Sequence, residues 1–182
     1  MKDLALHILD ILQNSVTAGA TRVELQIDEV PVRDLYMVKI SDNGRGMDAE
    51  MVQQVTDPFF TTRTTRKVGL GLPLLKQNAE RTGGSMTIQS KPGIGTEVDV
   101  VFVYSHIDRL PFGDIGGILA LTVSSYPAID FIYRHNTPEG AFIFNTFEIK
   151  EILGDLPVSN PKVIGFMKDL ISDNLKEINA SL

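Results

Sequence analysis

The chain has 182 residues, a formal net charge of −6 and 43% apolar residues. This length suits one or two small domains with a buried core, and the acidic balance argues against a nucleic-acid-binding surface, which is usually basic. The sequence has no cysteine, which excludes disulfides and thiolate metal sites and argues against structural zinc. No apolar run approaches membrane-spanning length and no cleavable signal precedes the first helix, so we expect a cytoplasmic protein without a membrane partner.

The first element predicted is an amphipathic helix from Leu4 to about Thr17. Asp10 and Asn14 are four positions apart and therefore project from one face of this helix. A carboxylate and a carboxamide placed in this way can hold Mg²⁺ and its waters beside phosphate groups. The alternative is the solvated polar edge of an amphipathic helix.

Two strands are expected next, over residues 21–29 and 35–41, with a turn between them. The second strand breaks at Asp42-Asn-Gly-Arg-Gly46, where a carboxylate is followed by two glycines. A buried carboxylate can accept the exocyclic amine of adenine, and a glycine at position 46 would leave room for a flat base. The alternative is an ordinary Asp-Asn-Gly hairpin turn.

Residues 57–72 are the most informative segment, because hydroxyls and three cations run directly into Gly69-Leu-Gly71 at the start of a helix. Glycines let a backbone approach an anion, and the free N–H groups at a helix start supply donors and partial positive charge. The pattern indicates a polyphosphate site, although a Gly-x-Gly before a helix also forms tight turns that bind nothing. This helix is expected to end at Thr82-Gly83-Gly84, where glycine supplies a left-handed cap.

A hairpin is predicted from strands over residues 85–90 and 96–104. Together these elements predict a two-layer α/β sandwich, in which helices cover one face of a mixed sheet and the site lies between the helices, beneath the segment before Gly69.

Residues 105–182 predict an α-β-β-α extension for which the sequence suggests no family. Asp114 can cap a helix, residues 128–134 and 141–147 alternate as a hairpin, and a last helix starts at Ser159-Asn160-Pro161. We expect the apolar side of that last helix to dock on its own hairpin, because soluble chains seldom leave such a stripe exposed.

The motifs of residues 4–103 together resemble the N, G1 and G2 boxes of the GHKL ATP-binding superfamily, which includes gyrase, heat-shock chaperones, histidine kinases and mismatch-repair ATPases. The run from Asp10 to Glu24 is most similar to the mismatch-repair N box. The run from Asp57 to Arg63, with Gly69-Leu-Gly-Leu72, Thr82-Gly-Gly-Ser85 and Ser90 to Thr96, is most similar to sensor histidine kinases. Four linked motifs are far more specific than any one of them.

The resemblance implies a histidine-kinase-like ATPase domain over residues 1–104, with ATP and Mg²⁺ as ligands. It implies that Asp42 binds adenine, Gly46 packs near the ring, Thr96 holds a water beside it, Asn14 is the magnesium ligand and Asp10 is the catalytic residue. The full set of expected ATP contacts is Asn14, Asp42, Gly44, Gly46, Met47, Phe60, Thr61, Thr62, Arg63, Arg66, Lys67, Gly69, Leu70, Gly71, Leu72 and Thr96.

Three departures from the family pattern bear on the chemistry. Hydrolytic members usually carry glutamate where this chain has Asp10, the second acid of the mismatch-repair N box falls at Thr17, and Lys67 stands where many kinases have a glycine. A general base must lie within about 3 Å of the water that it deprotonates, so the shorter Asp10 predicts slow hydrolysis.

The segment from Ser105 to Ile115 is similar to the phospho-acceptor box of histidine kinases, with His106 in the acceptor position. The match is incomplete, because the acid is displaced by one position and Pro111 and Gly113 interrupt any long helix. The alternative is a loop histidine at a strand end.

The sequence therefore predicts an Mg-ATP-binding protein that acts as an ATPase or as a protein kinase on a partner in trans, with a homodimer left open. From a different class, the alternative is a non-enzymatic, nucleotide-gated interaction module.

Overall fold

The computed structural model describes residues 2–57 and 71–181. Its helices are α1 (Leu4–Thr17), α2 (Ala49–Gln54), α3 (Gly71–Arg81), α4 (Ile115–Ser125), α5 (Thr146–Leu153) and α6 (Pro161–Glu177). Its strands are β1 (Arg22–Val30), β2 (Leu35–Asp42), β3 (Ser85–Lys91), β4 (Gly95–Val103), β5 (Asp130–Thr137) and β6 (Gly140–Asn145), and a 3-10 turn, η1 (Pro31–Arg33), joins β1 to β2.

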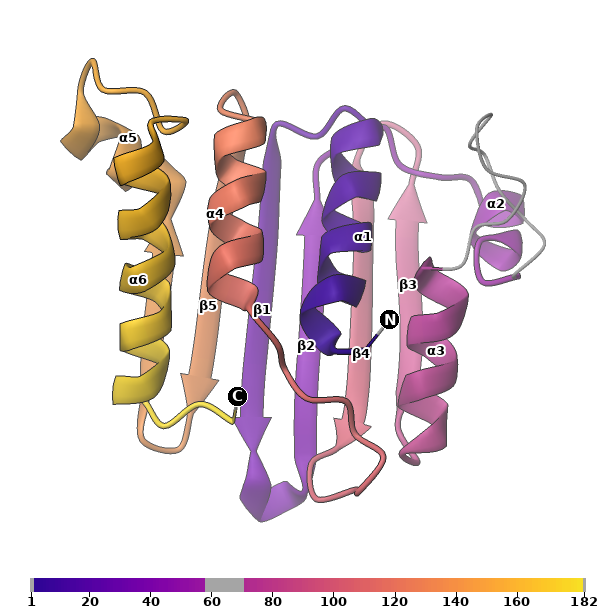
Figure 1. The fold of residues 1–182 in the computed structure, drawn as a ribbon. Coiled ribbons are helices and arrows are strands. Elements are labelled where there is room, and N and C mark those ends of the chain that lie inside the picture. Colours follow the sequence, from indigo (N-terminus) through magenta and orange to yellow (C-terminus); the bar gives the residue numbers. More distant parts are fainter. Residues whose placement is uncertain (1, 58–70, 182) are drawn as a thin grey trace.

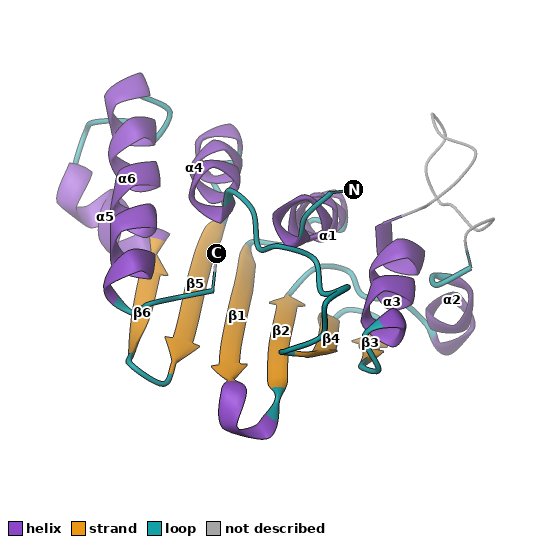
Figure 2. Ribbon diagram, turned by 60° about the horizontal axis from the view of Figure 1, so that its bottom comes forward, coloured by secondary structure: helices purple, strands orange, loops and turns teal. Residues whose placement is uncertain are grey.

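The six strands form a single mixed sheet in the order β3-β4-β2-β1-β5-β6. Strands β1 and β5 pair in parallel, and the other neighbouring strands pair antiparallel. Figure 1 shows the helices in front of the sheet, and Figure 2 shows that α1, α3, α4 and α6 lie on one of its faces. The predicted two-layer α/β sandwich is confirmed. Within the described ranges, no helix has the length and apolar character needed to span a membrane.

The predicted ends of the helices follow from local capping. Asp3 accepts a 2.9 Å hydrogen bond from the backbone N–H of Leu6 at the start of α1, and Asp114 does the same for Gly117 in α4 at 2.8 Å. Asn160 caps α6 just before Pro161. Helix α3 is followed by Gly83, whose φ of +80° is the left-handed conformation expected of a glycine cap.

Two short helices were not predicted. Asp48 caps α2 and Asn145 caps α5 through side-chain hydrogen bonds to the backbone N–H groups of Met51 and Phe147. Residues up to 147 were expected to be strand, but β6 ends at Asn145 because the capping side chain starts α5 there. The extension is therefore α-β-β-α-α.

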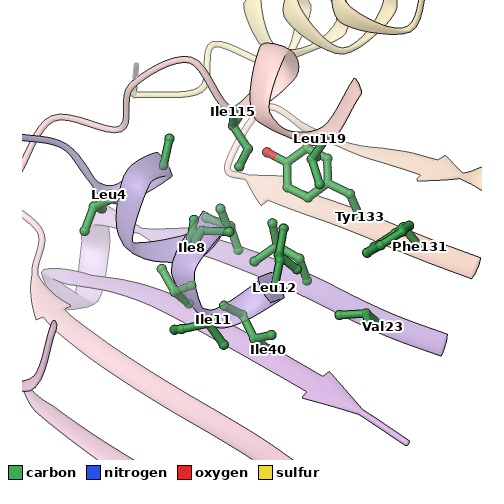
Figure 3. Packing of buried hydrophobic residues seen from close by; sticks show 14 of the residues in the cluster. Leu4, Ile8, Ile11, Leu12, Val23, Ile40, Ile115, Leu119, Phe131 and Tyr133 are labelled. Carbon is green, nitrogen blue, oxygen red and sulfur yellow. The ribbon is translucent and has the colours of Figure 1, made fainter. Parts of the chain in front are cut away.

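The apolar residues of α1 form the centre of the core. Figure 3 shows Leu4, Ile8, Ile11 and Leu12 facing side chains of β1, β2, α4 and β5, including Val23, Ile40, Leu119 and Tyr133. Burying a side chain of this size stabilises the fold by roughly 1.5–3 kcal/mol. Because buried residues of the extension belong to the same cluster, α1 packs simultaneously on both parts of the chain.

The extension joins the sheet through the β1–β5 pairing, which places Ile27 beside His135. Beyond that pair, the buried carboxylate of Glu29 accepts hydrogen bonds from His135 Nε2 and from the backbone N–H of Ser181, both at 2.8 Å. Burial alone would raise the pKa of Glu29, but these hydrogen bonds hold that pKa below its usual value.

Helix α6 packs chiefly against α4 and to a smaller extent on β6, so the predicted docking on its own hairpin is only part of its contact surface.

Candidate nucleotide-binding site

The predicted site residues converge at one end of the sheet. The end of β2, the C-terminal half of α1 and the start of α3 lie there, toward the top right of Figure 1, and the short α2 lies further out, next to β3. Asp42 is the last residue of β2, and Asn14 lies on the last turn of α1. Gly71 is the first described residue of α3. The site is therefore built from elements that are well separated in the sequence.

The carboxylate of Asp42 is fixed by two donors. Ser15 Oγ on α1 donates to Asp42 Oδ2 at 2.7 Å, and the backbone N–H of Gly44 donates to Asp42 Oδ1 at 2.9 Å. A carboxylate offers about four acceptor positions, so roughly two remain for a ligand. Ser15 is one of the buried residues of α1, and its contact with Asp42 was not predicted from the sequence.

The loop after β2 is held in place by backbone hydrogen bonds. The N–H of Arg45 donates to the carbonyl of Ala18 at 2.9 Å, and the N–H of Gly93 donates to the carbonyl of Arg45 at 2.7 Å. Gly46 has φ +67°, and a Cβ added to it would overlap the carbonyl oxygen of Lys91. Glycine at this position is thus required by the close approach of the β3–β4 turn, a reason different from the room for a base that the sequence suggested.

Thr96 lies next to Asp42, because the two residues are directly paired between β4 and β2. The hydroxyl of Thr96 is 2.9 Å from Ser90 Oγ, which also accepts a 2.8 Å hydrogen bond from the backbone N–H of Met47. Ser90 thereby connects Met47 with Thr96. Its role was not predicted, because its partners lie on a different loop and on the neighbouring strand.

Asp10 and Asn14 are both half-buried on the side of α1 that faces α3. A Cβ added to Gly71 would overlap the Asp10 carboxylate, so this carboxylate lies directly against the first described residue of α3. A helix start favours a neighbouring negative charge. The structure therefore brings Asp10 to the place where the sequence expects phosphates.

His7 lies one turn before Asp10 and is a neighbour that the sequence did not reveal. Its ring is 1% exposed, and Asn78 Nδ2 on α3 donates to its Nε2 at 3.0 Å. An amide nitrogen only donates, so the ring proton is assigned to Nδ1. Burial lowers the pKa of His7, although a hydrogen bond to the backbone of Gly71 and the charge of the nearby Asp10 act in the opposite direction. A neutral His7 thus links α1 to α3.

Several predicted contacts do not fall into this arrangement. Leu72 is 8% exposed and belongs to the hydrophobic core. The predicted contacts Phe60, Thr61, Thr62, Arg63, Arg66, Lys67, Gly69 and Leu70 lie outside the described residues.

His106 is placed at the opposite end of β2. It belongs to the loop after β4, where the backbone N–H of Tyr104 donates to the carbonyl of Asp34 at 3.0 Å. Asp34 precedes β2 and Asp42 ends it, and an eight-residue strand is roughly 25 Å long. His106 Nδ1 accepts a 3.1 Å hydrogen bond from the N–H of Asp108, which is the local contact of a loop histidine.

The described residues fit a purine nucleotide in their chemistry. Asp42 offers fixed acceptor positions beside the hydroxyl of Thr96, and the carboxamide of Asn14 offers an oxygen of the kind that Mg²⁺ prefers. The start of α3 offers N–H donors to an anion. These groups come from four elements, β2, β4, α1 and α3, that share one end of the sheet.

Over about half of its length the chain is similar to known proteins. The chain is 33% identical over 95 residues to the signal transduction histidine-protein kinase AtoS of Escherichia coli, covering 52% of this chain and 16% of that protein. It is 35% identical over 89 residues to the sensor protein kinase FleS of Pseudomonas aeruginosa, covering 49% and 22%. The chain thus spans less than a quarter of either relative.

Two solved structures share the fold. The N-terminal domain of a DNA repair protein has a TM-score of 0.58 and 17% identity, covering 80% of this chain and 52% of that one. The MutL ATPase domain of Aquifex aeolicus, complexed with ADP, has a TM-score of 0.51 and 16% identity, covering 74% and 60%. Residues 2–106 match the family described as histidine kinase-, DNA gyrase B-, and HSP90-like ATPase, and the chain belongs to this family.

Proposed function

We propose that the chain binds Mg-ATP with the adenine amine on Asp42 and the phosphates toward the start of α3. The observation that carries this proposal is the fixed carboxylate of Asp42, held by Ser15 and Gly44 with acceptor positions to spare. Gly46, Met47 and Thr96 would border the base. Membership of an ATPase family supports the choice of ATP as the ligand.

Asn14 would hold the magnesium ion, which in nucleotide sites usually keeps most of its ligands from phosphates and water. The bound ion would neutralise charge on the phosphates and supply electrophilic assistance to phosphoryl transfer. The cations and hydroxyls of residues 61–67 would contact the phosphates from the segment between α2 and α3.

For the reaction, we propose phosphoryl transfer either to water or to a protein partner in trans. Asp10 would orient or deprotonate the attacking group, and its short side chain favours slow hydrolysis. The position of His106 at the far end of β2 supports a partner in trans over transfer within one chain. Similarity to sensor kinases supports a signalling role, and a cytoplasmic location is part of the same proposal.

The alternative is a non-enzymatic module whose interactions change when ATP binds. It is favoured by the position of Asp10, whose carboxylate lies against Gly71 and is therefore less available as a base. In this case ATP would still bind through Asp42, but no phosphate would be released or transferred.

The test combines calorimetry with two phosphate assays on the same samples. Asp42→Asn removes a charged acceptor, which typically costs about 1.5–3 kcal/mol, so ATP affinity should fall at least about tenfold. Asp34→Asn, at the other end of the same strand, is the matched control and should leave affinity unchanged. Unchanged affinity in a folded Asp42→Asn protein would refute the proposed base pocket.

The phosphate assays then separate the reactions. Released phosphate indicates hydrolysis, and phosphate bound to an added cellular protein fraction indicates kinase activity. If ATP binds tightly but no phosphate is released or transferred, the non-enzymatic alternative replaces both hydrolysis and kinase activity as the proposed function.

A further inference from the structure

The outer side of α6 carries an exposed aromatic residue beside a glycine. Phe166 is 58% exposed, and an added Cβ on Gly165 would meet no atom within 4 Å. Figures 1 and 2 show α6 at the edge of the helical layer that is remote from α3, with its outer side away from the sheet. The described part of the protein therefore leaves both residues accessible.

Neither residue has a role in the fold of one chain. Glycine inside a helix destabilises it by about 1 kcal/mol relative to alanine, and open space around Gly165 means that no internal contact requires it. By contrast, a side chain on Gly116 of α4 would press against Ser172 and the backbone of Lys168 in α6, so that glycine serves packing between the two helices.

Two charges flank the pair symmetrically. Lys162 and Asp169 lie at equal distances on either side of Gly165 and Phe166, about one helical turn away, on the same exposed side. They are too far apart along the helix to pair with each other, and within residues 2–57 and 71–181 neither forms an ion pair. Other charges of α6 do have partners, since Lys168 lies 3.0 Å from Asp114 and Lys176 lies 2.9 Å from Asp173.

We propose that this surface, formed by Lys162, Gly165, Phe166 and Asp169, binds a second copy of the chain through an antiparallel pair of α6 helices. A two-fold axis between Gly165 and Phe166 brings each Lys162 opposite the partner copy's Asp169. It also places the two Phe166 rings together, while the absence of a side chain at Gly165 lets the helices approach closely. The surface is thus complementary to itself in both charge and shape, as a two-fold interface requires.

The proposed surface on α6 and the start of α3 lie far apart in the helical layer, so the dimer contacts do not include the candidate nucleotide site. Dimer formation therefore needs no nucleotide, and the dimer can be tested independently of ATP binding.

Analytical ultracentrifugation of the full chain over a range of concentrations tests the proposal. The wild-type chain should form dimers, and Phe166→Asp should raise the dissociation constant roughly tenfold or more, because it places like charges at the axis. Val32→Asp is the control, since Val32 is 93% exposed in η1 and lies outside the surface. A wild-type chain that stays monomeric throughout, or a Phe166→Asp dimer as tight as wild type, would overturn the proposal.

Charge reversal tests the antiparallel register itself. In the Lys162→Asp homodimer, each of the two contacts brings two carboxylates together. In the Asp169→Lys homodimer, each contact brings two ammonium groups together, so both homodimers should be weakened. When the two variants are mixed, both ion pairs form in the heterodimer, which should be tighter than either homodimer. Failure of the mixture to form heterodimers, while both single variants are folded and monomeric, would exclude this register.

Discussion

The hydroxyl of Ser15 on α1 donates a 2.7 Å hydrogen bond to the carboxylate of Asp42 at the end of β2. Ser15 is buried, so the bond is shielded from water and aims the carboxylate from the helical layer. It couples the helix that carries Asp10 and Asn14 to the strand end that carries the proposed adenine acceptor.

Ser15→Ala should therefore lower ATP affinity while the chain stays folded. Hydrogen bonds to charged groups contribute about 1.5–3 kcal/mol, so a loss of about tenfold is expected in calorimetry. Adding Asp42→Asn should cost little more, because the two groups act as one unit. Ser125→Ala is the control, because it removes a helical serine hydroxyl that donates to the carbonyl of Leu121, within its own helix. If the losses of ATP-binding free energy in Ser15→Ala and Asp42→Asn add in full in the double variant, the two residues are not coupled in this way.

Asn14→Ala should weaken binding of Mg-ATP more than binding of ATP in the presence of a chelator. The reason is that its carboxamide is proposed to act through the metal, whose contribution disappears when magnesium is removed. Gln13→Ala, at the exposed neighbouring position of α1, should change neither affinity. If Asn14→Ala lowers the affinity for Mg-ATP and for metal-free ATP by the same factor, Asn14 acts as a structural residue and not as a metal ligand.

Changes at Asp10 should separate binding from chemistry. Asp10→Glu should raise phosphate release, because the longer side chain brings the carboxylate closer to an attacking water. Asp10→Asn should abolish release with ATP binding largely kept, since general-base help is worth about 10²–10⁴ in rate. The readouts are steady-state phosphate release and calorimetry. Turnover that persists in Asp10→Asn would mean that Asp10 is not the base.

The stability of the fold should fall in mild acid because of His7. Burial lowers its folded-state pKa below the usual 6.5, so below that pH the unfolded chain binds a proton that the folded chain does not. The free energy of unfolding should therefore decrease as the pH drops from 6.5 toward the lowered folded-state pKa. Urea unfolding measured across this range should show a weaker pH dependence for His7→Gln than for wild type.

His106→Gln is the matched histidine control, because it removes a loop histidine instead of a buried one. If it flattens the pH dependence as much as His7→Gln does, the assignment to His7 is wrong.

The sequence predicted the parts of the fold that depend on neighbours in the chain. Residues of alternating polarity predicted β1 and β2, and the capping residues Asp114 and Asn160 predicted the starts of α4 and α6. Helices α2 and α5 were missed because a run of six or eight residues carries too little periodicity to detect. The pairing of β1 with β5 was missed because it joins residues more than a hundred positions apart.

The same distinction applies to the site. Asp42, Thr96, Asp10 and Asn14 were identified from motifs, and the structure places them at one end of the sheet. The supporting contacts of Ser15, Ser90 and His7 were not predicted, because their partners lie 27, 43 and 71 positions away. Such contacts exist only after the layers have assembled, so no local pattern marks them.

The parallel pairing of β1 with β5 also orders events during synthesis of the chain. Residues 22–30 leave the ribosome together with their antiparallel partner β2, but β5 begins only at residue 130. Until then, one edge of β1 presents unpaired backbone groups, with Val23, Leu25 and Ile27 alternating along the strand. Open edges of this kind recruit other strands. A nascent chain halted near residue 106 would therefore be prone to aggregate, and emergence of β5 would end that exposure.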